Sequence, residues 1–201
     1  MEKEMAEEKI VKLILLKEGI YDLEKDLIIK CPISIHGAGQ NKTILQRHGF
    51  KIRGTKKEKK RVNMQGTTIK GSSGKGLYNH NGLSFLCKDM TFTQCGGYGV
   101  YAWNTTGRLI NCVATQCEKS GILCDENALI ELEGSQTKVD GNGTRGYGHY
   151  GLYACDRRSS IIHLLFPLTK ESVSTNNKGG RNYGGSGGTI LQVPVFEEKE
   201  E

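Results

Sequence analysis

The stretch that decides the fold is Asp89-Met-Thr-Phe-Thr-Gln-Cys95, which returns 22 residues later as Asn111-Cys-Val-Ala-Thr-Gln-Cys117. Each copy is followed by a glycine and an aliphatic residue, at Gly99-Val100 and Gly121-Ile122. A repeat in the twenties, with strand-type residues and no helical pattern between copies, is typical of a solenoid that stacks parallel strands. The sequence therefore predicts an all-β solenoid.

A glycine-led segment occurs four times in one register: Gly76-Leu77-Tyr78-Asn79-His80, Gly99-Val100-Tyr101-Ala102-Trp103, Gly121-Ile122-Leu123-Cys124-Asp125 and Gly151-Leu152-Tyr153-Ala154-Cys155. Two further series predict about three strands in each coil. They are Leu109-Ile110, Leu129-Ile130 and Ile161-Ile162, and then Phe92, Ala114, Val139 and Val173. Earlier short strands are expected over residues 27–29, 33–35, 43–45, 50–52 and 62–64.

The chain divides into three parts. Residues 1–18 begin with Glu and Lys around apolar positions, which favours a helical N-terminal cap that ends at Gly19. Residues 19–193 are predicted to form one parallel β-helix domain of about seven coils, and residues 194–201 an acidic tail. Because the ends of a solenoid leave strand edges unpaired, self-association through these ends is a further expectation.

At this point the chain resembles a known family, the right-handed parallel β-helix or pectin-lyase-like superfamily. The resemblance covers roughly residues 20–193 and rests on the glycine-led strands, the Leu-Ile pairs and the corners at Gln94-Cys95 and Gln116-Cys117. It is closest to short stand-alone β-helix repeat proteins of algae and protists. The resemblance implies a right-handed, single-stranded parallel β-helix. It selects no activity, because this fold hosts lyases, hydrolases, epimerases, adhesins and inert modules.

Composition limits the class of protein. The 201 residues, 36% of them hydrophobic, suit one globular domain. No run reaches roughly 18 uninterrupted apolar residues, so no membrane span is expected. The N-terminus is acidic where a secretory signal would be basic and then apolar. We expect a cytoplasmic protein, or an extracellular one if the chain is part of a longer exported protein.

The seven cysteines do not favour a metal site. They include no Cys-x-x-Cys pair, and the densest group is Cys112, Cys117 and Cys124. Cys95 and Cys117 occupy equivalent repeat positions, which indicates small buried side chains that stack. We therefore expect no metal and no cofactor, with calcium only if the protein is a polysaccharide lyase.

Alternation along the glycine-led strand sends neighbouring side chains to opposite faces. It predicts one outward column of Tyr78, Tyr101, Leu123 and Tyr153 and a second column of His80, Trp103, Asp125 and Cys155. The predicted binding residues are Tyr78, His80, Tyr101, Trp103 and Tyr153, and the expected ligand is a carbohydrate or a protein partner. The alternative is an aromatic ladder that stabilises the sheet beneath an insertion loop.

Candidate acids and bases occur later in the chain: Lys138, Asp140, His149, Asp156 and Arg157. The resemblance implies that lyases would use Lys or Arg as the base, often with calcium, and that hydrolases would use clustered Asp residues. The family's Asn-Thr-Asp pattern meets Asn104-Thr105-Thr106, which lacks the carboxylate. We therefore favour a non-catalytic binding or scaffold module. The alternative is a polysaccharide lyase, hydrolase or epimerase that acts on an acidic glycan.

A basic region covers residues 42–75, where eleven Lys or Arg accompany the single acid Glu58, and it includes the run 56–61. Such a region attracts anionic polymers. No aromatic residue interrupts the basic run and no nucleic-acid-binding module surrounds it, so the sequence does not favour a nucleic acid partner. A solvated basic loop is the simpler interpretation.

Overall fold

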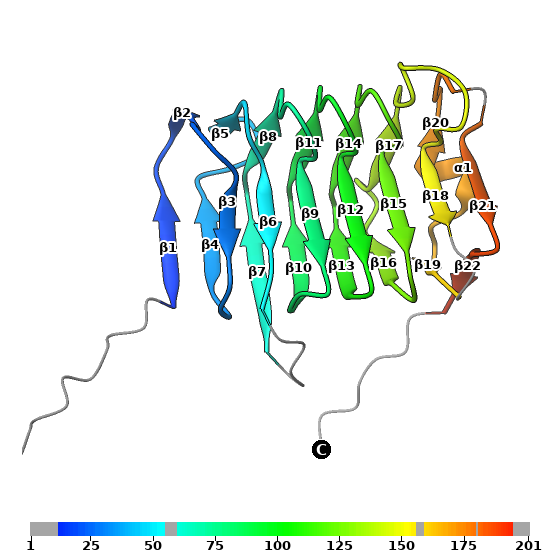
Figure 1. Ribbon diagram of the computed structural model, residues 1–201, viewed down its shortest axis with the longest axis horizontal. Coiled ribbons are helices and arrows are strands. Elements are labelled where there is room, and N and C mark those ends of the chain that lie inside the picture. Colours follow the sequence, from blue (N-terminus) through cyan, green and yellow to red (C-terminus); the bar gives the residue numbers. More distant parts are fainter. Residues whose placement is uncertain (1–11, 55–59, 156–158, 180, 195–201) are drawn as a thin grey trace, which may run out of the picture.

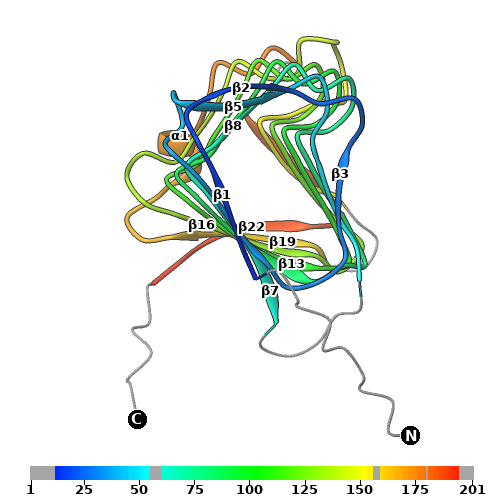
Figure 2. The same cartoon turned by 90° about the vertical axis from the view of Figure 1, so that its left-hand side faces the viewer.

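The protein forms a parallel β-helix whose coils follow one another along a single axis (Figure 1). The computed structural model describes residues 12–54, 60–155, 159–179 and 181–194. Viewed from the N-terminal end, the chain runs clockwise as it recedes, so the coil is right-handed (Figure 2). Within these residues, three strands make up each of seven coils, and a final strand begins an eighth. The predicted all-β solenoid of about seven coils is confirmed.

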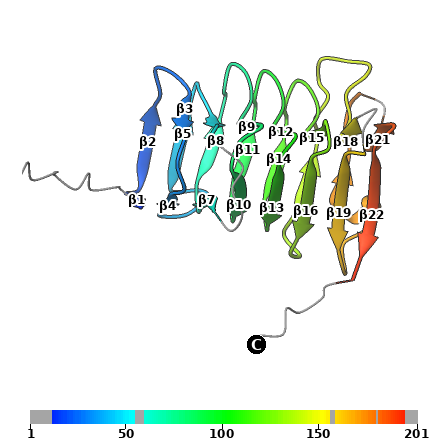
Figure 3. The same ribbon diagram turned by 60° about the horizontal axis from the view of Figure 1, so that its bottom comes forward.

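Each side of the solenoid is one parallel sheet. Sheet A consists of β1 (Leu13–Leu16), β4 (Ser34–Gly37), β7 (Arg61–Gln65), β10 (Ser84–Lys88), β13 (Thr106–Ile110), β16 (Leu129–Glu133), β19 (Ile161–Leu165) and β22 (Thr189–Val193). These strands lie side by side along the axis (Figure 3). Sheet B consists of β2 (Gly19–Asp22), β5 (Thr43–Gln46), β8 (Thr68–Lys70), β11 (Thr91–Thr93), β14 (Val113–Thr115), β17 (Lys138–Asp140) and β20 (Ser174–Thr175).

Sheet C holds the glycine-led segments. It consists of β3 (Leu27–Ile29), β6 (Phe50–Ile52), β9 (Leu77–His80), β12 (Val100–Trp103), β15 (Ile122–Asp125), β18 (Leu152–Cys155) and β21 (Tyr183–Ser186). Leu77, Val100, Ile122 and Leu152 are paired in register and are at most 2% exposed. Burial of each such side chain contributes roughly 1.5–3 kcal/mol. The predicted layering of these segments is therefore confirmed.

The other two series need correction. In sheet A, the sequence predicts equivalent positions for Leu109 and Leu129, but Leu109 pairs with Leu132 and Leu129 pairs with Thr106. In sheet B, Val139 pairs with Ser174, so the proposed member Val173 is one residue out of place. Val173 ends the short helix α1 (Lys170–Val173), whose turn shifts the register. The helix begins with a capping box in which Thr169 and Ser172 bond each other.

One interior contact shows how closely the coils pack. Gly107 lies in β13 directly opposite Phe85 of β10, and both are buried. A Cβ atom on Gly107 would lie 2.1 Å from Cζ of Phe85. Glycine inside a strand marks such a close approach, so the ring of one coil occupies the space that a side chain of the next coil would fill.

Buried amides close the corner between sheets B and C in the last coils. The Asn142 side chain donates to the Ala114 carbonyl at 2.9 Å and accepts from the Cys117 N–H at 3.0 Å. Its backbone N–H donates to Asn177 Oδ1 at 2.9 Å. These bonds satisfy backbone groups at the base of the connection between β17 and β18, which projects beyond the other corners (Figures 1 and 3).

The N-terminal end exposes apolar side chains. Leu15 is 70% and Ile20 67% exposed, on β1 and β2, and among the described residues these strands have no neighbour on their outer edge. The segment assigned to the cap therefore already contains β1. The predicted helix lies largely in residues 1–11, and most of the acidic tail in residues 195–201, outside the described residues. Self-association through the ends stays a prediction.

Candidate functional site

The outer face of sheet C presents the predicted aromatic residues on three of its strands. Tyr78 of β9 pairs in register with Tyr101 of β12, and His80 pairs with Trp103. Tyr153 lies on β18, two coils beyond β12. We call these five residues the aromatic strip. His80 is exposed and the other four side chains are partly exposed, so the strip is accessible to a ligand.

The rings of the strip stack on one another along the axis. The Tyr78 and Tyr101 centroids are 5.2 Å apart with planes tilted by 34°, and those of His80 and Trp103 are 5.5 Å apart with a tilt of 32°. Much of each ring face is therefore directed at its neighbour. This is the geometry of a ladder that stabilises the sheet, and it leaves ring edges and the ends of the ladder for a ligand.

Tyr153 is separated from the rest of the strip. Between Tyr101 and Tyr153 the same column holds Leu123, which is only 4% exposed although it lies on the outer face. Tyr153 instead packs against Tyr150, at 4.6 Å between centroids. The working part of the strip is therefore the group on β9 and β12.

Residues from the turns add to this surface. Tyr98, just before β12, lies 5.2 Å from Tyr101 between centroids, and His149 of the projecting connection meets Tyr98 edge to face at 6.4 Å. Burial, and then the charges of Lys119 and Arg145, lowers the pKa of His149. His149 thus covers the edge of the strip as a mainly neutral ring, as the insertion-loop alternative anticipates.

Three lysines lie over rings of this face. Lys75 Nζ is 4.0 Å from the Tyr78 centroid and 5.3 Å from that of Tyr101. Lys51 Nζ is 5.6 Å from the Tyr78 centroid, and Lys119 Nζ is 5.3 Å from that of Tyr98. Burial lowers the pKa of Lys75, and the neighbouring charges of Lys51 and Lys119 lower it further. The strip is therefore lined by cations that repel one another.

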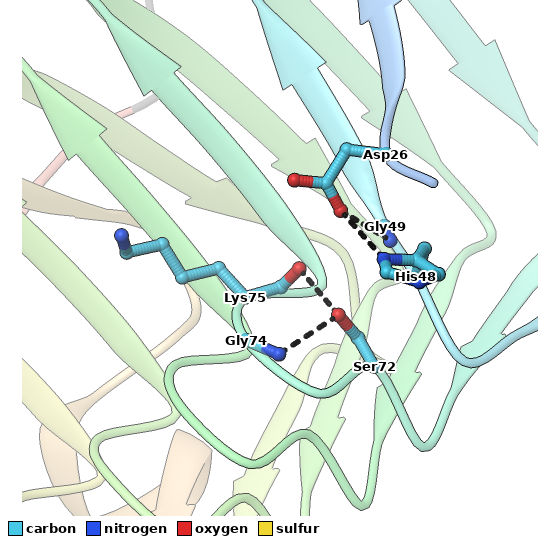
Figure 4. A network of polar contacts seen from close by, with 6 residues as sticks. All are labelled: Asp26, His48, Gly49, Ser72, Gly74 and Lys75. Atoms are coloured by element: carbon cyan, nitrogen blue, oxygen red, sulfur yellow. Dashed lines mark hydrogen bonds and ion pairs between the residues drawn. The ribbon is translucent and has the colours of Figure 1, made fainter. Parts of the chain in front are cut away.

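A polar network in the corner between sheets B and C holds Lys75 in place (Figure 4). The buried Ser72 hydroxyl donates to the Lys75 carbonyl at 2.9 Å and accepts from the Gly74 N–H at 3.4 Å. Two coils earlier, Asp26 Oδ1 accepts from the Gly49 N–H and lies 3.4 Å from His48 Nδ1. The Lys75 side chain extends away from the Asp26–His48 pair. Ser72 thus fixes the turn from which Lys75 reaches the rings.

Tyr101 has a direct carboxylate partner. Its hydroxyl donates to Asp125 Oδ2 of the next coil at 3.1 Å. Burial raises the pKa of Tyr101, and the Asp125 carboxylate raises it further. Tyr101 therefore stays protonated and fixed in position over the ordinary pH range.

A hollow opens where the ladder ends. Its volume is about 400 Å³, and its lining residues are Lys51, Arg53, Gly54, Tyr78, His80 and Asn81. In the coil that contains β6, the residue paired with Tyr78 is Lys51, so no aromatic ring continues the stack of Tyr78 and Tyr101. Gly54 of the same coil adds no side chain, and the space stays open. The size suits a small ligand or one unit of a polymer.

The candidate acids and bases do not gather at one point. Lys138 and Asp140 lie on β17 in sheet B, whereas His149 lies beside the strip on sheet C. Asp140 accepts from Thr175 at 2.8 Å, and this bond is the main cause that lowers the pKa of Asp140. Asp156 and Arg157 lie outside the described residues. The described candidates therefore form no common site.

Within the described residues, no group of three or more His, Cys, Asp or Glu is placed to hold a metal ion. Cys95 and Cys117 are fully buried at equivalent positions, as their spacing predicts, and no disulfide joins any of the cysteines. In the same part of the chain, no helix is long and apolar enough to cross a membrane.

Sequence reasoning located the rings but missed the cations beside them. Lys51, Arg53 and Lys75 belong to the basic region 42–75, which the sequence separates from Tyr101 and Trp103. Stacking of successive coils brings the two together. The run 56–61 itself is described only at Lys60 and at Arg61, where β7 begins.

Comparison with known proteins adds no further guide, because no protein-family model, curated protein or solved structure matches the chain.

Proposed function

We propose that the protein is a non-catalytic β-helix module that binds a carbohydrate through the aromatic strip. The main support is the arrangement at the end of the ladder, where Tyr78 and His80 border a hollow of about 400 Å³ that also contains hydrogen-bond donors. Carbohydrate sites combine aromatic surfaces with a few polar groups that fix orientation. A protein partner is the second ligand class that such a strip suits.

We also propose that the chain belongs to the pectin-lyase-like superfamily. The supporting features are the three parallel sheets, the right-handed coil and the stacked glycine-led strands. This proposal concerns descent and fold, and it transfers no activity to the chain.

The alternative of a carbohydrate-active enzyme requires ionisable groups that converge on one point. Lys138 and Asp140 lie on sheet B, and Asp125, a carboxylate beside the strip, is bonded to Tyr101. These placements favour binding without turnover. Incubation with pectate, alginate and polygalacturonate, with and without calcium, is the direct check, and product formation from any of them would refute the non-catalytic assignment.

The binding proposal is tested with a panel of neutral and acidic oligosaccharides and titration calorimetry. We expect Trp103→Ala and Tyr101→Ala each to weaken binding of the best glycan about tenfold, because each removes a ring contact. Tyr147→Ala is the matched control, since Tyr147 is 100% exposed in the projecting connection and, within the described residues, makes no ring contact with the strip. Binding that survives unchanged in both strip variants would refute the proposed site. Failure of every glycan to bind would leave only the protein-partner form of the proposal.

A further inference from the structure

The hollow at the end of the ladder has the lining of an anion site. Lys51 and Arg53 enter it from β6 and the residue that follows it, and Tyr78 and His80 enter it from the corresponding positions of the next coil, where Asn81 follows. No carboxylate is among the described residues that line it. Neither Lys51 nor Arg53 forms an ion pair with a described carboxylate, whereas Lys42, Arg47 and Arg108 each do.

The polar groups of the hollow are directed as donors. Asn81 Oδ1 accepts from the Asn104 side chain at 2.6 Å, so the amide nitrogen of Asn81 remains to donate. Arg53 and Tyr78 line the same hollow. Burial raises the pKa of Tyr78, and the Arg53 charge opposes this rise. An ammonium, a guanidinium, an amide and an imidazole thus border one space.

Charge decides which anion fits. Lys51 and Arg53 supply two positive charges that described carboxylates do not neutralise. A carboxylate or a sulfate ester has one negative charge, whereas a phosphate monoester has about 1.5 to 2 at pH 7 and three terminal oxygens. Arginine also suits a phosphate because its planar fork donates two parallel hydrogen bonds.

We propose that this hollow binds a phosphate monoester on a ring compound, with Lys51 and Arg53 on the phosphate and with Tyr78 and His80 beside the ring. The inference rests on the proposed function, because the same ligand would continue onto the aromatic strip. The volume of about 400 Å³ accommodates a phosphorylated sugar. A nucleotide has the same phosphate chemistry, and the experiment separates these two sources.

The experiment is titration calorimetry of the full chain with glucose 6-phosphate, adenosine monophosphate, glucuronate and glucose. We expect a phosphate monoester to bind at least about tenfold more tightly than glucuronate, and glucose to bind too weakly to measure. Binding of glucose 6-phosphate identifies a sugar ligand, and preference for the nucleotide identifies a nucleotide ligand. Equal affinity for glucuronate and both phosphate esters, or binding of neither ester, would overturn the proposal.

Two pairs of variants locate the site. Arg53→Gln and Lys51→Gln should each weaken phosphate-ester binding about tenfold, because each removes a charged hydrogen bond. Arg47→Gln and Lys42→Gln make the same changes at exposed positions of the same coil that pair with Asp22 and Glu18, and they should leave binding unchanged. Equal losses in all four variants would show a diffuse charge effect and overturn the site.

These experiments distinguish failure of the phosphate site in the hollow from failure of the glycan site on the aromatic strip. If Trp103→Ala abolishes glycan binding while no phosphate ester binds, the strip is supported and the hollow is rejected. If a phosphate ester binds in an Arg53-dependent manner while Trp103→Ala leaves glycan binding unchanged, the hollow is supported and the strip is rejected.

Discussion

The contact between Phe85 and Gly107 permits a quantitative test of how the coils pack. Phe85 is 2% exposed, and its Cζ atom would lie 2.1 Å from a Cβ atom on Gly107. Gly107→Ala should therefore cost about 1–3 kcal/mol through overpacking. Phe85→Ala should cost about 3–5 kcal/mol through lost burial and the cavity that it leaves.

The free-energy costs of these two substitutions should not be additive. In the Phe85→Ala background, the new methyl group at position 107 enters space that the ring has vacated, so Gly107→Ala should cost little or even stabilise. We expect a coupling energy of at least about 1 kcal/mol, within the range of roughly 0.5–3 kcal/mol for residues in contact.

Urea unfolding measures this cycle. The emission of Trp103, the single tryptophan of the chain, and far-ultraviolet circular dichroism provide two independent probes. Gly74→Ala is the control, because an added Cβ at Gly74 meets no atom within 4 Å, and it should change the free energy of unfolding by less than about 0.5 kcal/mol. Costs that add within about 0.5 kcal/mol would refute the proposed contact between coils.

Three further predictions concern pH, thiols and a buried amide. Burial raises the pKa of Tyr101, and it raises that of Cys112 to about 12, so the folded state retains these protons longer than the unfolded state does. The free energy of unfolding should therefore fall as pH rises from about 9 toward 12, and a urea midpoint that is constant over this range would contradict the burial. In the native protein, a thiol reagent should modify only the exposed Cys31 and the partly exposed Cys155, and the five buried cysteines should react only after unfolding. Rapid reaction of more than two thiols would contradict the burial of these five side chains. Asn142→Ala should lower the free energy of unfolding by about 1–3 kcal/mol because it leaves the buried Cys117 N–H without its partner, whereas the exposed Asn41→Ala should have little effect; equal midpoints for both variants would count against the amide bonds.

The glycine-led strands made the fold predictable, because their spacing and alternation repeat in sequence. Val100, Ile122 and Leu152 could be assigned to one interior column, and Tyr101 and Trp103 to the outer face, before any coordinates. The register of Leu109 could not be predicted, since several positions of one sheet A strand face the interior. The register of Val173 could not be predicted either, because a helical turn precedes β20.

The surroundings of the site were less predictable. Leu123 alternates outward like Tyr101, yet it is only 4% exposed. Lys51 approaches the Tyr78 ring, and Lys75 the Tyr101 ring, because coils stack, and no local motif in the sequence relates these lysines to those rings. Side-chain positions in the turns depend on contacts between coils, which repeat spacing alone does not determine.

The most direct test of the account is to follow Trp103 emission while oligosaccharides are added. Trp103 is the single tryptophan, and it lies within the aromatic strip. We predict a saturable change in emission with at least one glycan, and we predict that Tyr101→Ala weakens this response while Tyr147→Ala leaves it intact. A glycan that binds by calorimetry without any change in Trp103 emission, and equally well to Trp103→Ala, would contradict the central claim that the strip is the binding surface.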